Sequence, residues 1–443
     1  MKALRTYVGI DLGSTTTKAV VLNDAGAVIG RGITNSRSNY DVACQVVREE
    51  ALIRTRFTLT GQAITGDPAL AQVEKAFLSS LERNFRLRQH LDQLAQLRDA
   101  LFSAADDPRH NTHRTELDAA VERILDGMAQ RTGFHFSELA VRKSDFFRDL
   151  ATADYMQLAE QQSDPRGITF DMLCGLFDAA ILVVENATTQ GSFETQLRGA
   201  LEPTLASAAS AVQEKASRLR AVVEATCGTE LVEAGTVGTG YGRQRLPFPK
   251  EQIRSEILCH GLGAHAMFPG TRTVLDIGGQ DTKAIQVDGD GIVVSFQMND
   301  RCAAGCGRYL GYIADEMNLG LHELGPLAQK SQCRVKINST CTVFAGAELR
   351  ERLSLGQRRE DILAGLHRAI ILRAMSLLAR SGGVSDEFTF TGGVARNPAA
   401  VSALRELVQE NYGDRTLNIS ADSIYTGALG AALFARRTAQ VNA

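Results

Sequence analysis

The sequence predicts an α/β protein with two like domains and a large helical insertion. The first observation is a short segment written twice, as DLGSTTTK at residues 11–18 and as DIGGQDTK at residues 276–283. Each position of the second copy follows its counterpart by 265 residues, and the same offset relates Gly26 to Gly291. The second observation is a long stretch of helical spacing between the two copies. Chance is a poor explanation for a repeat in one ungapped register, which indicates a duplicated unit.

Each copy reads as a meander of three strands. In the first copy the strands are predicted at Arg5–Ile10, Thr17–Leu22 and Val28–Ile33, and the second meander covers Thr273–Gln297. The first turn of each meander is rich in Gly and polar side chains, a composition that lets backbone N–H groups close on a phosphate. Two such meanders in one chain therefore predict two like domains facing each other across a nucleotide.

The region from about 43 to 220 has the spacing of helices. Apolar residues from Leu87 to Met128 recur at intervals that line one helical face, which indicates a helical insertion with its own small core. Breaks are predicted at Asp106-Asp-Pro-Arg and at Ser163-Asp-Pro-Arg-Gly. No chemical motif is present in this region, so a structural role is favoured over a lid or an interaction surface.

The later elements set the domain boundaries. We expect a first domain at 1–42 and 221–268 with a C-terminal helix at 425–440 returning to it, the insertion at 43–220, and a second domain at 269–424. The elements predicted in the second half are, in order, a strand before the Gly-rich segment at Thr236–Arg243, a helix at Glu251–His265, the second meander, a helix after Cys302, a short strand into Cys341, helices at Val343–Ser354 and Arg358–Arg380, and a strand at Phe388–Thr391 that leads into Gly392 and Gly393.

Composition excludes several classes of function. The 443 residues carry a net charge of −3 and no basic tract, which gives no electrostatic case for a nucleic-acid partner. No apolar run approaches the length that spans a bilayer, and the N-terminus leads straight into the first strand without room for a signal peptide. We therefore expect a cytoplasmic protein with no nucleic-acid and no membrane partner.

The sequence contains no Walker A loop, which argues against a P-loop ATPase. The two hairpins are instead the candidate nucleotide site. Gly13 and Gly278 lack a Cβ and allow the close approach that a phosphate at a turn requires. Asp11 and Asp276, at strand ends, are placed to hold Mg²⁺ through waters and to orient an attacking water. One hairpin of this kind is often merely structural, but two in register with a later Gly-Gly after a strand favour a nucleotide site.

The cysteines need a separate argument. Cytoplasmic cysteines argue against disulfides, and for the scattered ones a packing role is favoured. Cys302 is predicted at a helix N-terminus, where the helix dipole favours a thiolate, and Cys341 just ahead of another helix. Spacing alone favours structural roles, since the C-x₂-C pairs of zinc and ferredoxin sites are missing. Two thiolates cannot complete a four-cysteine cluster unless another subunit supplies two more. The eight cysteines are Cys44, Cys174, Cys227, Cys259, Cys302, Cys306, Cys333 and Cys341.

The two hairpins and the later Gly-Gly resemble those of the acetate kinase, sugar kinase, Hsp70 and actin superfamily, in which two ribonuclease-H-like domains close on ATP. The resemblance implies that the hairpins hold the phosphates and that the Gly-Gly lies against the adenine and ribose. The candidate catalytic residues are Asp11, Asp276 and Gln280, and the candidate nucleotide-binding residues are Gly13, Ser14, Thr15, Thr16, Lys18, Gly278, Gly279, Asp281, Gly392 and Gly393.

A narrower resemblance covers residues 5–42 and 230–437. The segments NDRCAAGCGR, STCTVFA, DIGGQD and TGYGR are similar to those of the activators of 2-hydroxyacyl-CoA dehydratases and the ATP-binding subunits of benzoyl-CoA reductase. In that family one [4Fe–4S] cluster bridges two subunits, and the two cysteines that each subunit gives match Cys302 and Cys341. Cys306 stands where a Thr is expected in the dehydratase activators, and Cys333 matches no ligand position.

The resemblance implies an electron-activating ATPase with ATP, Mg²⁺ and the shared cluster as cofactors. The length of the chain favours the larger ATP-binding subunit of an ATP-dependent benzoyl-CoA reductase over a dehydratase activator. The implied partners are a paralogous ATPase subunit, substrate-binding iron–sulfur subunits and a ferredoxin-like donor. Rival hypotheses are the dehydratase activator, a sugar or small-molecule kinase without a cluster, and an actin-like or chaperone ATPase.

Overall fold

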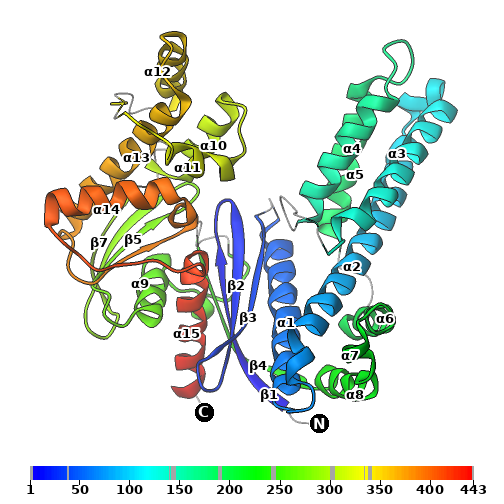
Figure 1. Ribbon diagram of the computed structural model, residues 1–443, viewed down its shortest axis with the longest axis horizontal. Coiled ribbons are helices and arrows are strands. Elements are labelled where there is room, and N and C mark those ends of the chain that lie inside the picture. Colours follow the sequence, from blue (N-terminus) through cyan, green and yellow to red (C-terminus); the bar gives the residue numbers. More distant parts are fainter. Residues whose placement is uncertain are drawn as a thin grey trace. The chain divides into compact units, whose positions relative to one another are not determined.

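The computed structural model describes residues 3–36, 39–138, 140, 146–187, 192–240, 246–299, 305–333, 335–337 and 342–441. The chain divides into two compact units (Figure 1). The sheet unit comprises Ala3–Arg54 and Leu231–Ala443, and the helical unit comprises Thr55–Glu230. The sheet unit carries both meanders, and all three strands of each are confirmed near their predicted positions.

The sheet unit contains two sheets of similar construction. The first has the order β3-β2-β1-β4 and the second the order β7-β6-β5-β8-β9. In each, the three strands of a meander are antiparallel and a later strand adds beside the first strand of the meander. The strands are β1 (Ala3–Leu12), β2 (Thr16–Asn23), β3 (Val28–Asn35), β4 (Glu230–Gly240), β5 (Thr273–Ile277), β6 (Thr282–Val287), β7 (Val293–Asn299), β8 (Phe388–Thr391) and β9 (Leu417–Asn418).

The duplication extends to the hydrogen-bonded register of the two meanders. Asp11 pairs with Lys18 on the neighbouring strand, and the residues 265 positions later, Asp276 and Lys283, pair in the same way. The irregularity in β2, after Val21, recurs in β6 at the same offset. A bulge bends a strand and strengthens its local twist, so the two meanders share their shape as well as their sequence pattern.

A further equivalence joins the strands that follow each meander. Gly240 ends β4 with φ +124°, and Gly392 follows β8 with φ +86°. A Cβ on Gly240 would lie 2.2 Å from the carbonyl oxygen of Leu12, and one on Gly392 would lie 2.3 Å from that of Ile277. Leu12 and Ile277 are themselves 265 residues apart, so both glycines pack on equivalent points of the two hairpins. Only a residue without Cβ fits there.

Helices flank both sheets of the sheet unit. The C-terminal helix α15 lies along β1 and β2 and against α9, where small residues allow close packing (Figure 1). The helix α13 is long and apolar enough to cross a membrane by length and composition alone, but most of it is buried in the core of the second sheet. The helices are α1 (Tyr40–Thr65, which continues into the helical unit), α9 (Glu256–Met267), α10 (Gly307–Glu316), α11 (Leu321–Ala328), α12 (Thr342–Ser354), α13 (Arg359–Ser381), α14 (Pro398–Tyr412) and α15 (Thr426–Val441), with short 3₁₀ turns η4 (Lys250–Gln252), η6 (Gly393–Arg396) and η7 (Ser423–Tyr425).

The helical unit has its own core between α2, α3, α4 and α5. Both predicted breaks are confirmed, because α2 ends at Ala105 and α4 ends at Gln162, each just before an Asp-Pro pair. Pro cannot donate to the helical ladder, which explains the stops. The elements are η1 (Ala71–Val73), α2 (Glu74–Ala105), η2 (Pro108–His113), α3 (Arg114–His135), α4 (Phe147–Gln162), α5 (Phe170–Asn186), α6 (Phe193–Ala206), α7 (Ser210–Gln213) and α8 (Ala216–Cys227).

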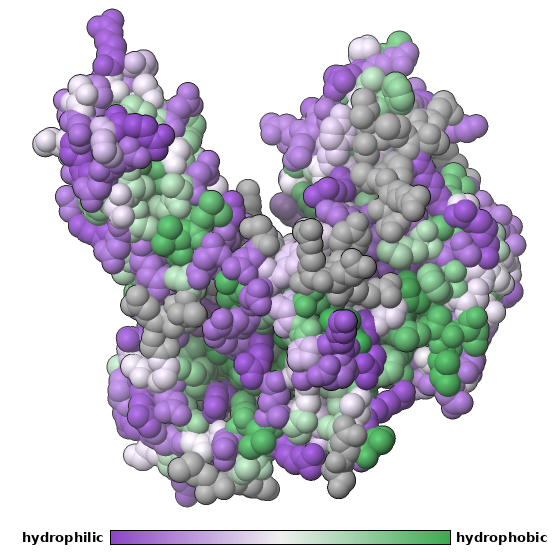
Figure 2. Space-filling model, turned by 180° about the vertical axis from the view of Figure 1, so that it is seen from behind, coloured by the Kyte–Doolittle hydropathy of each residue, from purple (hydrophilic) through white to green (hydrophobic). Residues whose placement is uncertain are grey.

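Apolar side chains are interspersed with polar ones on the surface (Figure 2). Among the most exposed are Val294 and Phe296 on the edge strand β7, which are 64% and 49% exposed. Single exposed apolar residues are common on folded proteins and by themselves indicate no function.

Three predictions about local structure need correction or fall outside the described residues. The helix predicted from Glu251 begins at Glu256, because a short 3₁₀ turn precedes it. The helix predicted to begin at Cys302 has its first described residue at Gly307, with Cys306 at the N-cap. Among the described residues, 335–337 form no strand ahead of Cys341. Cys302 and Cys341 themselves, and residues 241–245, lie outside the described residues.

Candidate functional site between the two hairpins

The structure brings the tips of the two predicted phosphate hairpins together. A Cβ on Gly279 in the second tip would lie 2.3 Å from the hydroxyl oxygen of Thr15 in the first. Asp11 and Asp276 lie at equivalent places behind the tips, 3% and 2% exposed. The strand register fixes this placement, because each aspartate sits one residue before the end of its strand.

The first hairpin leaves its polar groups accessible. Thr15 is exposed, while Ser14 and Thr16 are half-buried. Ser36, just after β3, supports the turn, because its hydroxyl donates to the Gly13 carbonyl and its N–H donates to the Thr15 carbonyl. The hydroxyl groups predicted to bind phosphate therefore surround a turn that other residues hold in place.

Lys18 is the cation of the first hairpin. Its Nζ lies 4.0 Å from Oδ2 of Asp11, and its side chain is 16% exposed. A Cβ on Gly13 would lie 3.1 Å from that Nζ, so the ammonium is close to the turn itself. A lysine in this position can reach a phosphate bound at the tip.

Lys283, the equivalent lysine of the second hairpin, is enclosed by carboxylates. Its Nζ lies 2.7 Å from Asp281 Oδ2, 2.9 Å from Glu256 Oε1 and 3.4 Å from Asp276 Oδ2, and its side chain is 1% exposed. Burial alone would lower the pKa of Lys283, but the three surrounding carboxylates outweigh it and raise the pKa. Lys283 is therefore a buried structural cation.

Asp281 and Asp276 respond differently to the same surroundings. Burial raises the pKa of Asp281 despite the neighbouring Lys283. Burial also acts to raise the pKa of Asp276, but His260, Lys283 and the hydroxyl of Thr391 outweigh it, so that pKa is lowered and the carboxylate stays ionised. The structure places Asp281, a predicted nucleotide-binding residue, against Lys283.

The later Gly-Gly lies beside the second hairpin. Thr391, the last residue of β8, donates its hydroxyl to Asp276 Oδ1 at 2.8 Å. Gly392 packs on the hairpin backbone, whereas a Cβ on Gly393 would meet nothing within 4 Å. Gly393 therefore faces open space, as a residue lying against a ligand would. Gln280, Gly278 and Gly279 are half-buried at the second tip.

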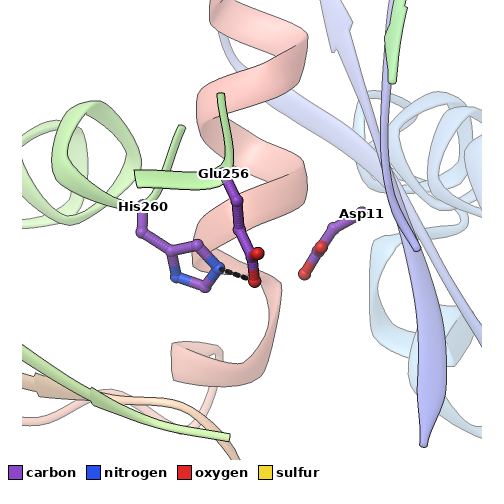
Figure 3. A group of neighbouring side chains, drawn as sticks. All are labelled: Asp11, Glu256 and His260. Atoms are coloured by element: carbon purple, nitrogen blue, oxygen red, sulfur yellow. Dashed lines mark ion pairs between the residues drawn. The ribbon is translucent and has the colours of Figure 1, made fainter. Parts of the chain in front are cut away.

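Two residues that the sequence did not point to lie behind the hairpins. Glu256 and His260 are one turn apart on α9, and Figure 3 shows them beside Asp11. His260 Nε2 lies 3.8 Å from Glu256 Oε1, and His260 Nδ1 lies 3.3 Å from Asp276 Oδ1, outside hydrogen-bond alignment. Burial acts to lower the pKa of His260, but the charge of Asp276 outweighs it and raises the pKa. In the sequence, the four-residue spacing of Glu256 and His260 on a predicted helix could have indicated that their side chains share one helical face.

The second hairpin is hydrogen-bonded to the start of α10. Gly307 and Arg308 donate their backbone N–H groups to the carbonyls of Gly278 and Gly279, each at 2.8 Å. Thr282 donates its hydroxyl to the Gly305 carbonyl at 2.6 Å. Carbonyls of the hairpin thus satisfy N–H groups that a helix N-terminus leaves free, and they join the hairpin to the segment that follows Cys302.

The helices that follow Cys302 and Cys341 run side by side in one direction. A Cβ on Gly346 of α12 would lie 2.4 Å from the hydroxyl of Tyr312 on α10, and one turn further Arg350 pairs with Glu316. The N-terminal ends of α10 and α12 therefore lie at the same end of this pair. Of the two other cysteines in this region, Cys306 is buried and Cys333 is exposed.

Comparison with known proteins identifies related sequences. A model of the BadF/BadG/BcrA/BcrD ATPase family matches residues 8–435. The (R)-2-hydroxyglutaryl-CoA dehydratase activating ATPase of Acidaminococcus fermentans is 44% identical over 206 residues, which are 46% of this chain and 76% of that protein. One of the benzoyl-CoA reductase subunits of Thauera aromatica is 33% identical over 175 residues, which are 40% of this chain and 62% of that protein.

Two solved structures share the fold. Component A of the Acidaminococcus fermentans (R)-2-hydroxyglutaryl-CoA dehydratase has a TM-score of 0.55 at 23% identity, covering 98% of this chain and 99% of that one. The activator of the 2-hydroxyisocaproyl-CoA dehydratase from Clostridium difficile, with bound ADPNP, has a TM-score of 0.53 at 22% identity, covering 99% and 96%. The predicted fold class, an α/β ATPase of the actin type, is confirmed.

Proposed function

The chain belongs to the BadF/BadG/BcrA/BcrD ATPase family, and we propose that it hydrolyses ATP between its two hairpins in order to activate an electron-accepting partner enzyme. The observation that carries the nucleotide site is the meeting of two hairpins in one register, with Thr15 against Gly279 and an aspartate behind each tip. A related activator binds ADPNP, which supports the same ligand here.

In this proposal the hairpins hold the phosphates and the two aspartates act behind them. Backbone N–H groups at the tips, the hydroxyl of Thr15 and the ammonium of Lys18 bind phosphate oxygens. Asp11 and Asp276 would hold Mg²⁺, which would neutralise charge on the phosphates, and their carboxylates would orient the attacking water. Gln280 assists at the second tip, Gly392 fits against the second hairpin, and Gly393 leaves room for adenosine. Lys283 holds Asp276 ionised, because it stays charged inside the protein.

The electron-transferring group is proposed to be a [4Fe–4S] cluster that two chains share through Cys302 and Cys341. Both cysteines lie outside the described residues, but Gly307 and Thr342 begin two helices whose N-terminal ends lie together. Helix N-termini favour negative charge and hence thiolates. Hydrogen bonds join the second hairpin to the start of α10. Through them, a change of the bound nucleotide could alter the surroundings of the proposed cluster.

We propose a 2-hydroxyacyl-CoA dehydratase as the partner, in place of the benzoyl-CoA reductase that chain length favours. The higher identity is to a dehydratase activator, while the reductase protein is a more distant relative. An inserted helical unit changes length without changing the hairpins, so length is the weaker guide. The chain would then form a homodimer that receives electrons from a ferredoxin-like donor and passes them to the dehydratase.

Anaerobic purification followed by iron and sulfide analysis tests the cluster. We expect about four iron atoms for each pair of chains. Cys302→Ala and Cys341→Ala should lose iron and still bind nucleotide, whereas Cys333→Ala is the matched control and should keep its iron. A colourless, iron-free protein whose Cys302→Ala and Cys341→Ala variants retain full ATPase activity would favour the kinase hypothesis.

The state of assembly tests the partner. A free homodimer that activates a dehydratase in trans supports the proposal. Stable copurification with three different subunits would instead support the benzoyl-CoA reductase hypothesis, since there the ATPase subunits belong to a permanent complex.

A further inference from the structure

Behind the hairpins lies a group of side chains with the composition of a metal site. Asp11, Glu256 and His260 each offer one ligand atom, and these atoms lie within 4.8 Å of one another. All three residues are buried, and they come from β1 and α9 (Figure 3). We propose that Asp11, Glu256 and His260 form a divalent-cation site that the chain fills in the absence of nucleotide.

The first argument is an unpartnered oxygen. Asp11 Oδ1 is buried and accepts no hydrogen bond, although the residue is only 3% exposed. Its carboxylate points toward Glu256 in Figure 3. A buried carboxylate oxygen without a partner is costly, and a cation is the ligand that satisfies it.

The second argument is the placement of His260 between two carboxylates. Its Nε2 faces Glu256 at 3.8 Å, and its Nδ1 faces Asp276 at 3.3 Å. Histidines that bind metals through one ring nitrogen almost always direct the other to a carboxylate or carbonyl, which orients the ring. Asp276 would take this supporting part while Nε2 binds the cation.

The third argument is the local charge. When ionised, the four carboxylates of this cluster carry four negative charges against the two positive charges of the lysines. His260 gives up any proton on Nε2 when that nitrogen binds a cation, and two negative charges are then left for the ion to balance. An uncompensated buried charge destabilises a fold, and a divalent cation balances this one. The charged groups are Asp11, Glu256, Asp276, Asp281, Lys18 and Lys283.

The geometry also indicates which cation fits. Neighbouring ligands at about 2.1 Å from one cation lie ~3.0–3.4 Å apart, so the three ligand atoms, which lie within 4.8 Å of one another, must close in by roughly 1 Å to hold the ion. Gly427 of α15 allows this, because a Cβ there would lie 2.8 Å from both Asp11 Oδ2 and His260 Nε2. One imidazole with two carboxylates suits Mn²⁺, Fe²⁺ or Zn²⁺ better than Ca²⁺.

The test is a Mn²⁺ titration of the full chain, stripped of metal by a chelator and free of nucleotide, followed by electron paramagnetic resonance. We expect one bound Mn²⁺ per chain, with pulsed spectra that show coupling to one imidazole nitrogen. Failure to bind one equivalent, or a bound Mn²⁺ without nitrogen coupling, would overturn the proposal. Neither outcome depends on a variant that has to fold.

Variants on α9 give the matched comparison. His260→Gln should weaken Mn²⁺ binding by more than about tenfold, as should Glu256→Gln. His265→Gln lies on the same helix, where His265 contacts the Gly289 carbonyl, and should leave binding unchanged. Equal affinity in all three variants would place the ion elsewhere. The proposed site shares Asp11 with the proposed nucleotide site, so nucleotide binding is measured separately. Loss of Mn²⁺ binding with nucleotide binding retained concerns the cation site alone, and the reverse result concerns the ATPase proposal alone.

Discussion

Lys18 and Lys283 occupy equivalent places in the two hairpins and have different surroundings. Lys18 has one carboxylate 4.0 Å away and keeps contact with solvent, whereas Lys283 is enclosed by three carboxylates. Equivalent positions thus hold a partly exposed lysine in one copy and a buried, fully paired lysine in the other. The difference comes from Glu256 and Asp281, because Thr16 stands where Asp281 stands in the second copy.

Replacing each of the two lysines with methionine should therefore have different effects. Lys283→Met should destabilise the sheet unit by about 3–5 kcal/mol, because it leaves buried carboxylates unpaired. Lys18→Met should destabilise the unit less than Lys283→Met, because Lys18 lies 4.0 Å from one carboxylate and keeps contact with solvent, and it should also weaken nucleotide binding. Denaturant unfolding and calorimetric titration with ADP measure the two quantities. Equal destabilisation by both substitutions would show that the environments do not differ as described.

His367 predicts a pH dependence of stability. It is buried on α13, donates from Nδ1 to the Leu363 carbonyl at 2.7 Å and accepts at Nε2 from Asn397 at 3.0 Å. Burial lowers its pKa to about 4 from the ordinary 6.5, so the folded form holds it neutral. The unfolded chain takes up the proton first as pH falls, so this contribution is complete above about pH 6.5 and is lost toward pH 4.

The slope of stability against pH tests whether His367 is the group responsible. Between pH 6.5 and 4 the stability of the sheet unit should fall by up to ~1.4 kcal/mol per pH unit from this one proton. His367→Gln should remove that part of the slope, as followed by urea unfolding at several pH values. An unchanged slope in the variant would assign the dependence to other groups.

At the scale of elements, the second hairpin and α10 form one hydrogen-bonded piece. The backbone N–H groups of Gly307 and Arg308 and the hydroxyl of Thr282 make the connection. The first hairpin is tied in a different way, because the equivalent Thr17 contacts the hydroxyl of Ser36 on its own meander. Within the part of the chain that the structure describes, these hydrogen bonds tie the start of α10 to the second hairpin and not to the first.

Replacing each threonine tests this connection. Thr282→Val leaves the Gly305 carbonyl without its donor, so we expect a local loss of about 1–3 kcal/mol. Amide exchange at Gly307 and Arg308 should then speed up by roughly tenfold for each 1.4 kcal/mol. Thr17→Val, the matched control, should leave these two amides unchanged. Similar exchange in both variants would mean that Thr282 does not hold the start of α10.

At the scale of the whole molecule, the chain combines a sheet unit that carries every candidate site residue with a helical unit that has its own core. A unit with its own core can unfold on its own. Scanning calorimetry should therefore resolve two transitions. A non-hydrolysable ATP analogue at about 100 times its Kd should stabilise only the sheet unit, by ~2.7 kcal/mol. A single transition, or an equal shift of both, would contradict this independence.

Local patterns predicted much of the fold. Alternating apolar residues and Gly-containing turns gave the six meander strands, and Asp-Pro pairs gave the breaks between helices. These signals depend on neighbours within a few positions, where backbone sterics decide the conformation. The 265-residue offset added the duplication, which the strand registers confirm.

The sequence by itself determined the two hairpins, their common register and the aspartates behind their tips. Only the tertiary structure decided that Glu256 and His260 lie beside Asp11, that Lys283 is buried among carboxylates, and that Gly240 matches Gly392. The physical reason is distance along the chain. Backbone periodicity specifies each strand and helix, whereas the burial and charge of a side chain depend on elements that folding brings together from distant parts of the sequence.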